Sequence, residues 1–250
     1  MAKPLRLRLA HLYPKLMNIY GDRGNIMCLR RRCELRGIEF EVTELGPGDK
    51  LRPKETDVVF IGGAQDREQH LVAEDLIKTK AKALKEAVER DVVVLAVCGG
   101  YQLAGKFYRS AEGGELPGAG ILDIWTAHLG PDARRFIGNV VVRWRGATLV
   151  GFENHGGRTH LGPGAAPLAE VVSGFGNNGE DGTEGAVYRN VLGTYLHGAL
   201  LPKNPALADF LIETALRRKG DFRLAEVDDR IESMAHSEAV RLATRRAIIG

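Results

Sequence analysis

A cysteine that follows a buried strand is the side chain of this protein best placed for covalent chemistry. Cys98 ends the apolar segment Val92-Val-Val-Leu-Ala-Val-Cys98 and is followed at once by Gly99-Gly100. A sharp turn from strand to helix holds a nucleophile in a strained, exposed position, and the N-terminus of the helix stabilises a thiolate and then an oxyanion. The alternative is a structural cysteine, because free cysteine is among the most buried residue types.

A histidine occupies a comparable position near the end of the chain. His197 follows the short apolar segment Asn190-Val-Leu-Gly-Thr-Tyr-Leu196 and precedes Gly198. A single histidine at a strand end is more often structural than catalytic. Two such turns at one edge of a parallel sheet can converge, however, and the imidazole then takes the thiol proton. Backbone N–H groups at Gly62-Gly63 and at Gly99 are candidate donors for an oxyanion hole.

Strands and helices alternate through the first hundred residues, which predicts the sheet that these two turns require. The predicted strands cover residues 5–13, 38–43, 57–61 and 92–97, and the predicted helices cover 25–36 and 73–90. Short strands separated by helices imply right-handed crossovers and an α/β fold. We therefore expect a mainly parallel open sheet flanked by helices, with the site at the carboxyl ends of its strands.

The second half of the chain has a different pattern. Residues 137–144 and 148–153 alternate around the turn Arg145-Gly146, which indicates an antiparallel extension of the sheet. Glycines are dense from Gly156 to Gly185 and predict exposed turns over the face that carries the site. A helix is expected to begin at Asn204-Pro205.

We predict two parts, a domain over residues 1–220 and a helical tail over residues 221–250. The tail is charged, and its apolar residues share one helical face; a helix packed back on the domain is favoured over an element that docks a partner. The residues of that face are Leu224, Val227, Ile231 and Met234.

Composition and charge exclude several other classes of protein. The 250 residues are 44% hydrophobic and 27% charged, which is typical of a soluble globular protein. A net charge of +3 gives no basic face for nucleic acid, and the run Arg30-Arg31-Arg32 is expected to be the solvated side of a helix. Three cysteines without paired spacing predict neither disulfides nor a metal site. With no signal peptide and no membrane-spanning segment in the sequence, a cytoplasmic protein is expected.

Three motifs together resemble the class I, or triad-type, glutamine amidotransferases, whose sheet is flavodoxin-like. They are Cys98-Gly99-Gly100-Tyr101-Gln102, Gly62-Gly63-Ala64-Gln65-Asp66 and Tyr195-Leu196-His197-Gly198. The pattern is most similar to the cobyric-acid-synthase-like branch and, within it, to the glutaminase subunits of lipid II isoglutaminyl synthases. That closer resemblance rests on residues 12–25, 105–108, 135–138 and 151–157, and the whole resemblance extends from about residue 5 to residue 220.

The resemblance implies a half-enzyme of peptidoglycan synthesis. Cys98 would attack the side-chain amide of glutamine, with His197 as the base, and the ammonia would pass to a MurT-like Mur ligase subunit in a heterodimer. That partner would use ATP to amidate the D-glutamate of lipid II. The chain contains no G-x-x-x-x-G-K-[ST] motif. We therefore expect no cofactor here, and ATP and magnesium on the partner.

For the remaining candidate site residues, the sequence is compatible with more than one role. Gln102 is expected to contact the substrate, or else to make a contact at the helix N-terminus. Arg135 is expected to hold the glutamine α-carboxylate bidentately, with a surface salt bridge as the alternative; His155 can line the same face. Many triad amidotransferases have glutamate two residues after the histidine, where this chain has Ala199. The site is then a Cys–His dyad, or another group orients His197.

Two other classes of function compete with the amidotransferase subunit. One is a different cysteine hydrolase or stress-response protein of the same architecture, which would release no ammonia from glutamine. The other is a catalytically silent scaffold, which would keep its function after Cys98→Ala. Within the amidotransferases the nearest rival is cobyric acid synthesis, but the sequence shows no ATP-binding synthetase domain of that kind.

Overall fold

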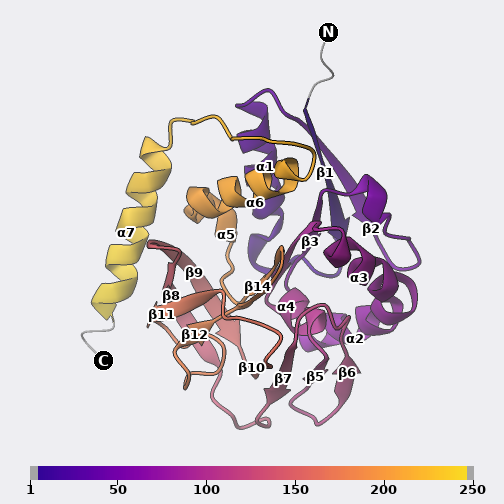
Figure 1. Cartoon of the computed structure of the whole chain (residues 1–250). Helices are drawn as coiled ribbons and strands as arrows, with labels where there is room; N and C mark the ends of the chain where they lie inside the picture. The colour runs from indigo at the N-terminus through magenta and orange to yellow at the C-terminus, as the bar shows by residue number, and fades with distance from the viewer. Residues whose placement is uncertain (1–4, 247–250) are drawn as a thin grey trace.

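A six-stranded sheet forms the centre of the protein, in a computed structural model that describes residues 5–246 (Figure 1). Its strand order is β13-β14-β4-β3-β1-β2. Only β13 runs antiparallel to its neighbour in this sheet. The predicted mainly parallel sheet is therefore confirmed. The strands are β1 (Arg6–Leu12), β2 (Glu39–Leu45), β3 (Val58–Ile61), β4 (Val93–Val97), β13 (Ala186–Tyr188) and β14 (Val191–Thr194).

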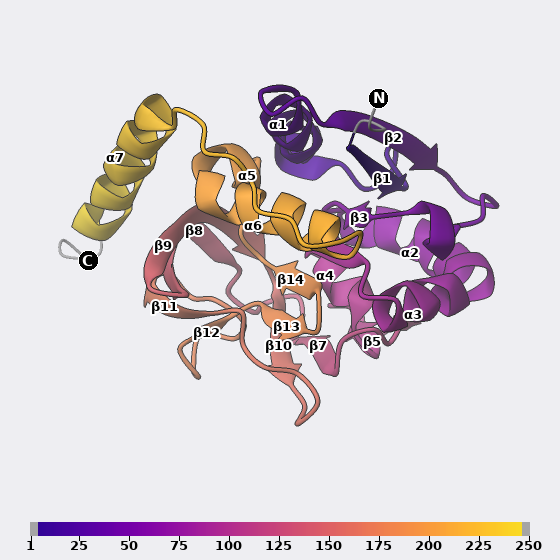
Figure 2. The same ribbon diagram turned by 45° about the horizontal axis from the view of Figure 1, so that its top comes forward.

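Helices cover both faces of this sheet, which explains why its central strands are continuously apolar (Figure 2). On β4, Val93, Leu95 and Val97 pack into the core under α1, α5 and α6. Val94 and Ala96 point the other way, into the core under α2, α3 and α4. The helices are α1 (Arg23–Glu34), α2 (Asp66–Asp75), α3 (Ala81–Glu89), α4 (Gly99–Ala104), α5 (Leu200–Lys203) and α6 (Pro205–Arg217), with short 3₁₀ turns at Ile19–Gly21 and Pro53–Glu55.

The helix predicted over residues 73–90 begins earlier and is interrupted. It starts with α2 at Asp66, and a π turn over Leu76–Lys80 separates α2 from α3. Lys80 is fully buried; its Nζ donates to Oδ2 of Asp75 at 2.5 Å and to the carbonyl of Gly46 at 2.9 Å. A π turn inserts one extra residue and so shifts the helical register. The sequence did not predict this π turn, because lysine is ordinarily a surface residue and a buried Lys80 was not expected.

Two further four-stranded sheets lie beside the central one, and the first of them contains the antiparallel extension predicted for residues 137–153. One contains the hairpin of β8 (Phe136–Trp144) and β9 (Ala147–His155), together with β11 (Ala169–Ser173) and β12 (Thr183–Glu184). Arg145 and Gly146 both have positive φ, 49° and 83°, as a two-residue hairpin turn requires. The other sheet has the order β10-β7-β5-β6, from β5 (Phe107–Arg109), β6 (Glu115–Pro117), β7 (Ile124–His128) and β10 (Gly157–Leu161).

The tail packs on the domain through a different face from the one predicted. Residues 221–229 are not helical, and α7 (Arg230–Arg246) stands at the side of the molecule against β8 and β9 (Figure 1). Its small residues Ala239, Val240 and Ala243 pack against those strands. Ile231 and Met234, expected on the packed face, are 80% and 73% exposed.

The arginine run on α1 is only partly a solvated surface. Arg30 and Arg31 are exposed, as predicted. Arg32 is buried and forms ion pairs with Asp209 of α6 and Asp229 before α7, at 2.5 and 2.7 Å. The prediction is therefore wrong for Arg32, which joins three segments that are distant in sequence. In the described part of the chain, no helix combines the length and apolar character needed to cross a bilayer.

Candidate active site

The turn at Cys98 has the strained geometry that the sequence predicted. Cys98 joins β4 to α4 with φ 52° and ψ −110°, a conformation that costs a non-glycine residue free energy. The backbone around it is tightly packed. A Cβ atom on Gly99 would lie 2.8 Å from the nitrogen of Ala64, and one on Gly100 would lie 2.6 Å from the carbonyl oxygen of Ile61. Only glycine fits at either position, so the Gly-Gly pair is what permits the turn.

His197 lies at the same edge of the sheet, one strand away from Cys98. The N–H of Cys98 donates to the carbonyl of Thr194, at the end of β14, over 2.8 Å. His197 follows three residues later, and its backbone pairs with Phe152 of β9 through hydrogen bonds of 3.0 and 3.2 Å. Its imidazole is fully buried beside the Phe152 ring, with centroids 6.0 Å apart. The structure therefore brings the two predicted turns together at one edge.

A cavity of about 490 Å³ opens beside the thiol. Cys98, Gln102 and Arg135 line it, as does His155, whereas His197 is not among the lining residues. A volume of this size accommodates a small polar metabolite. The other lining residues are Ile19, Ala64, Gln65, Asp66, Arg67, Gln69, Tyr108, Ile137, Asn154 and Gly156.

Burial controls the protonation of both predicted catalytic groups. It raises the pKa of the Cys98 thiol to about 12, with a further increase from Asp22; the Gly99 N–H and Arg135 act in the opposite direction. Burial lowers the pKa of His197 to about 4, assisted by His155 and Lys203. At neutral pH the pair is thus a thiol and a neutral imidazole. This differs from the thiolate expected from the helix N-terminus, because desolvation outweighs the hydrogen bond from the Gly99 N–H.

One of the predicted oxyanion donors is already in use. Gly63 donates its N–H to Oδ2 of Asp22 over 2.6 Å. Asp22 is fully buried, and burial raises its pKa to about 7. Its other oxygen, Oδ1, has no hydrogen-bond partner among the described residues. In this structure the Gly63 N–H is therefore bound to Asp22, while the predicted donor at Gly99 directly follows Cys98.

The two predicted substrate-binding side chains are held by neutral partners. Gln102 is buried; its Oε1 accepts from Nε2 of Gln69 at 2.9 Å, and its Nε2 donates to the hydroxyl of Tyr195 at 3.2 Å. Arg135 donates from Nε and Nη2 to Oδ1 of Asn154, at 3.2 and 3.1 Å. Within residues 5–246 Arg135 forms no salt bridge. Its guanidinium therefore keeps an unneutralised charge at the cavity.

Ala199 occupies the position where the resemblance implied a glutamate. Ala199 adopts a left-handed conformation, and its Cβ lies 2.8 Å from the position a Cβ on Gly24 would take. A buried carboxylate is present elsewhere in this region. Glu153 accepts the N–H groups of Phe175 and Gly176, and its Oε2 lies 3.8 Å from Nε2 of His155. In the described region no three His, Cys, Asp or Glu side chains gather in a way that could hold a metal ion.

Sequence reasoning missed several residues that shape the site, namely Asp22, Asp66, Gln69 and Tyr108. Asp22 lies in the segment Gly21-Asp22-Arg23-Gly24-Asn25, which the sequence marked as characteristic without assigning it a role. The structure shows one structural role for this segment. Asn25 accepts the N–H of Leu201 over 2.8 Å, so this segment is tied to the helix that follows His197.

Comparison with known proteins gives consistent matches across the chain. The CobB/CobQ-like glutamine amidotransferase domain matches residues 8–205. The lipid II isoglutaminyl synthase (glutamine-hydrolysing) subunit GatD of Staphylococcus aureus is 43% identical over 96% of this chain and 97% of its own length. GatD of Streptococcus pneumoniae is 41% identical over 90% of this chain and 87% of its own length.

A more distant relative in sequence and a solved structure of similar fold also match. The cobyric acid synthase of Pelotomaculum thermopropionicum is 34% identical over 73% of this chain, but only 38% of that protein is covered. A glutamine amidotransferase structure from Thermotoga maritima superposes with a TM-score of 0.53 at 17% identity, over 95% of this chain and 92% of that one. At that identity the likeness concerns the fold alone.

Proposed function

The chain belongs to the CobB/CobQ-like glutamine amidotransferases, and from that membership we propose that it is the glutaminase subunit of a lipid II isoglutaminyl synthase. Its relatives of that name are aligned over nearly the whole of both chains. The observation that carries the proposal is Cys98 on a strained turn at the wall of a cavity, one strand away from His197.

The proposed reaction begins with a neutral pair. As the sulfur of Cys98 attacks the side-chain amide carbon of glutamine, His197 accepts the thiol proton. The oxyanion that forms is stabilised by the N–H of Gly99. Collapse breaks the carbon–nitrogen bond, His197 returns the proton to the leaving nitrogen, and ammonia departs. Water then hydrolyses the thioester, giving glutamate and the free thiol.

The ammonia that this reaction releases requires a partner protein. Free ammonia is largely protonated at neutral pH and is then no nucleophile, so its use requires a sheltered route to a second site. We place that site on a MurT-like Mur ligase subunit that binds ATP and magnesium and amidates the D-glutamate of lipid II. The partner is expected to dock near the glycine-rich face that carries Arg135 and His197 and to increase glutamine turnover by ordering the loops there.

The alternative of cobyric acid synthesis has weaker support. The chain spans about two fifths of the cobyric acid synthase that it matches, whereas it spans almost the full length of the GatD subunits. A scaffold without activity remains distinguishable by experiment, because it would not require the thiol of Cys98.

The test uses the complex formed by co-expression with a Mur-ligase-like subunit. Light scattering should give the mass of a heterodimer, and the complex should amidate lipid II with ATP and glutamine. A Cys98→Ala complex should lose the glutamine-dependent reaction but retain amidation from ammonium chloride, which bypasses the glutaminase. The proposal is wrong if this chain alone amidates lipid II, or if the Cys98→Ala complex still uses glutamine.

A further inference from the structure

The cavity beside Cys98 contains two opposite charges that are not paired with each other. Asp66 is the first residue of α2, and Arg135 directly precedes β8; both line the cavity together with the thiol. Among the described residues, neither side chain forms a salt bridge. Opposite charges left without partners in one small cavity are complementary to a ligand that itself carries both charges.

Neutral groups hold each of these charges in place. The hydroxyl of Tyr108 donates to Oδ1 of Asp66 over 2.9 Å. Tyr108 is buried, and burial raises the pKa of its phenol, so that it remains a donor. Oδ2 of Asp66 makes no hydrogen bond with the described residues and can accept one from a ligand. On the other side chain, the contacts of Arg135 are to the amide oxygen and the carbonyl of Asn154.

Both charges lie close enough to the nucleophile to affect it. Arg135 lowers the pKa of the Cys98 thiol, and Asp66 raises it. Asp66 likewise raises, and Arg135 lowers, the pKa of Tyr108 and of His128. A molecule whose reactive carbon sits at Cys98 therefore meets both a cation and an anion on the wall of the same cavity.

We propose that Asp66 binds the α-ammonium group of glutamine while Arg135 binds its α-carboxylate. This assignment rests on the proposed function, since it gives the cavity its substrate. In glutamine three carbon–carbon bonds separate the reacting amide carbon from the α-carbon, so both α-groups lie within the cavity when the amide is at the thiol. Asp66 and Arg135 are both exposed at the mouth of the cavity, and an α-ammonium group beside Asp66 can form a charge-assisted hydrogen bond that an analogue without the amino group cannot make.

The experiment compares two substrates in the assembled complex. Wild-type and Asp66→Asn proteins are assayed for ammonia release from glutamine and from 4-carbamoylbutanoate, which is glutamine without the α-amino group. Loss of a charge-assisted hydrogen bond predicts that Asp66→Asn lowers kcat/KM for glutamine by about 10- to 100-fold, mainly through KM. For 4-carbamoylbutanoate the two proteins should agree within about twofold.

Glu68 offers a matched control. It lies on the same helix but not on the wall of this cavity, so Glu68→Gln should leave both substrates unaffected. Tyr108→Phe provides a second variant, which keeps the charge of Asp66 but removes the bond that positions it. It should raise KM for glutamine and leave KM for 4-carbamoylbutanoate unchanged, and it decides the question if Asp66→Asn does not fold.

Two kinds of failure are distinguishable. Equal losses on both substrates, or no loss on glutamine, would overturn the role of Asp66 while leaving the glutaminase intact. A wild-type complex that releases no ammonia from glutamine would instead overturn the proposed function, and the assignment of Asp66 with it.

Discussion

Gly63 donates its backbone N–H to Oδ2 of Asp22 over 2.6 Å, and the same glycine adjoins Cys98. A Cβ atom at Gly63 would lie 3.3 Å both from that oxygen and from Cβ of Cys98. A buried carboxylate and a buried thiol therefore flank one glycine. The carboxylate fixes the strand beside the site, and its charge opposes formation of the thiolate.

Replacing Asp22 by asparagine should make the thiol of Cys98 more acidic. Asparagine keeps an oxygen that can accept the Gly63 N–H but removes the negative charge that raises the thiol pKa. The rate of alkylation by iodoacetamide follows the thiolate fraction. Its pH profile at Cys98 should therefore move to lower pH in Asp22→Asn than in wild type. Asp49→Asn, an exposed site, is the control; an unchanged or opposite shift would exclude this effect of Asp22.

His197→Ala should lower the glutaminase kcat by about 100-fold or more, because proton removal from the thiol and proton delivery to the leaving ammonia both depend on it. The pKa of His197, lowered to about 4, keeps it a base at neutral pH. Steady-state ammonia release measures the loss, with His160→Ala as a control outside the cavity. A variant retaining more than about a tenth of the wild-type rate would remove His197 from this role.

Arg135→Met should raise KM for glutamine by about 10- to 100-fold with a smaller change in kcat, because in our proposal the guanidinium binds the substrate and takes no part in bond breaking. Arg143→Met is a matched control on β8, since Arg143 is exposed and pairs with Glu170. Initial rates over a range of glutamine concentrations separate the two parameters. If KM is unchanged and only kcat falls, Arg135 does not bind the α-carboxylate.

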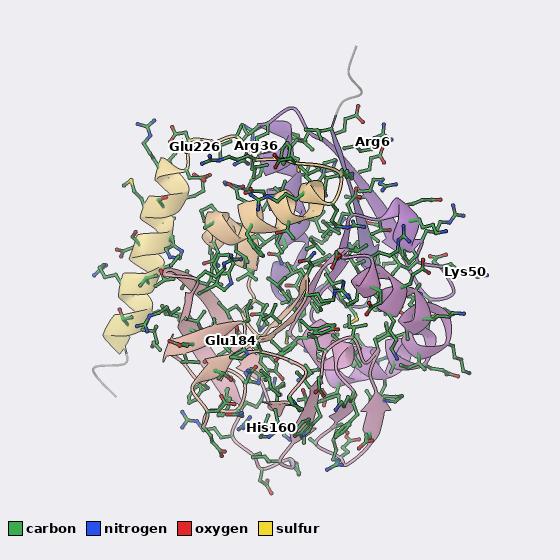
Figure 3. The ribbon with its side chains drawn as sticks, in the orientation of Figure 1. Arg6, Arg36, Lys50, His160, Glu184 and Glu226 are labelled. Carbon is green, nitrogen blue, oxygen red and sulfur yellow. The ribbon has the colours of Figure 1, made fainter. Side chains whose placement is uncertain are left out.

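Glu184 should make the folded protein less stable as the solution becomes alkaline. It lies in the interior (Figure 3), where burial raises its pKa from 4.5 to about 8. A folded-state pKa above the unfolded value means that the folded state binds the proton more tightly. That contribution is complete below about pH 4.5 and is lost as the pH rises through about 8.

Glu184→Gln tests this expectation. Glutamine keeps an oxygen that can accept the N–H of Tyr195 but does not titrate. Denaturant unfolding between pH 5 and pH 9 should show a smaller fall in stability for this variant than for wild type, while the exposed Glu170→Gln should match wild type. The pKa of Asp22 is also raised, so Asp22 too makes the folded state less stable as the pH rises, and some pH dependence of stability should remain in Glu184→Gln. Identical slopes in Glu184→Gln and wild type would contradict the expectation.

The sequence predicted the parallel sheet and both turns at its carboxyl edge because those features depend on local patterns. An apolar run followed by Gly99-Gly100 requires a strand buried on two faces and then a tight turn, and the strand is buried as expected. Arg145-Gly146 likewise specifies its hairpin by backbone conformation alone. Patterns of this kind need no knowledge of distant residues.

The features that the sequence missed depend on contacts between distant segments. The bond from Asp22 to Gly63 spans 41 residues, and the bond from Tyr108 to Asp66 spans 42. The acidity expected for Cys98 also failed to appear, because burial and a carboxylate from another loop outweigh the local helix. In the tail, Ala239, Val240 and Ala243 pack against the strands while the larger Ile231 and Met234 are exposed, so the most hydrophobic face was not the packed one.

The central claim, that Cys98 is the glutaminase nucleophile, is tested most directly by mapping where a chloroketone analogue of glutamine reacts. Mass spectrometry of the complex should find one equivalent bound at Cys98, with labelling prevented by glutamine and ammonia release lost in proportion. Cys98→Ala should take up no label and keep the fold, since the change in volume is small. Labelling at Cys28 or Cys33 instead, or ammonia release from glutamine by Cys98→Ala, would contradict the account.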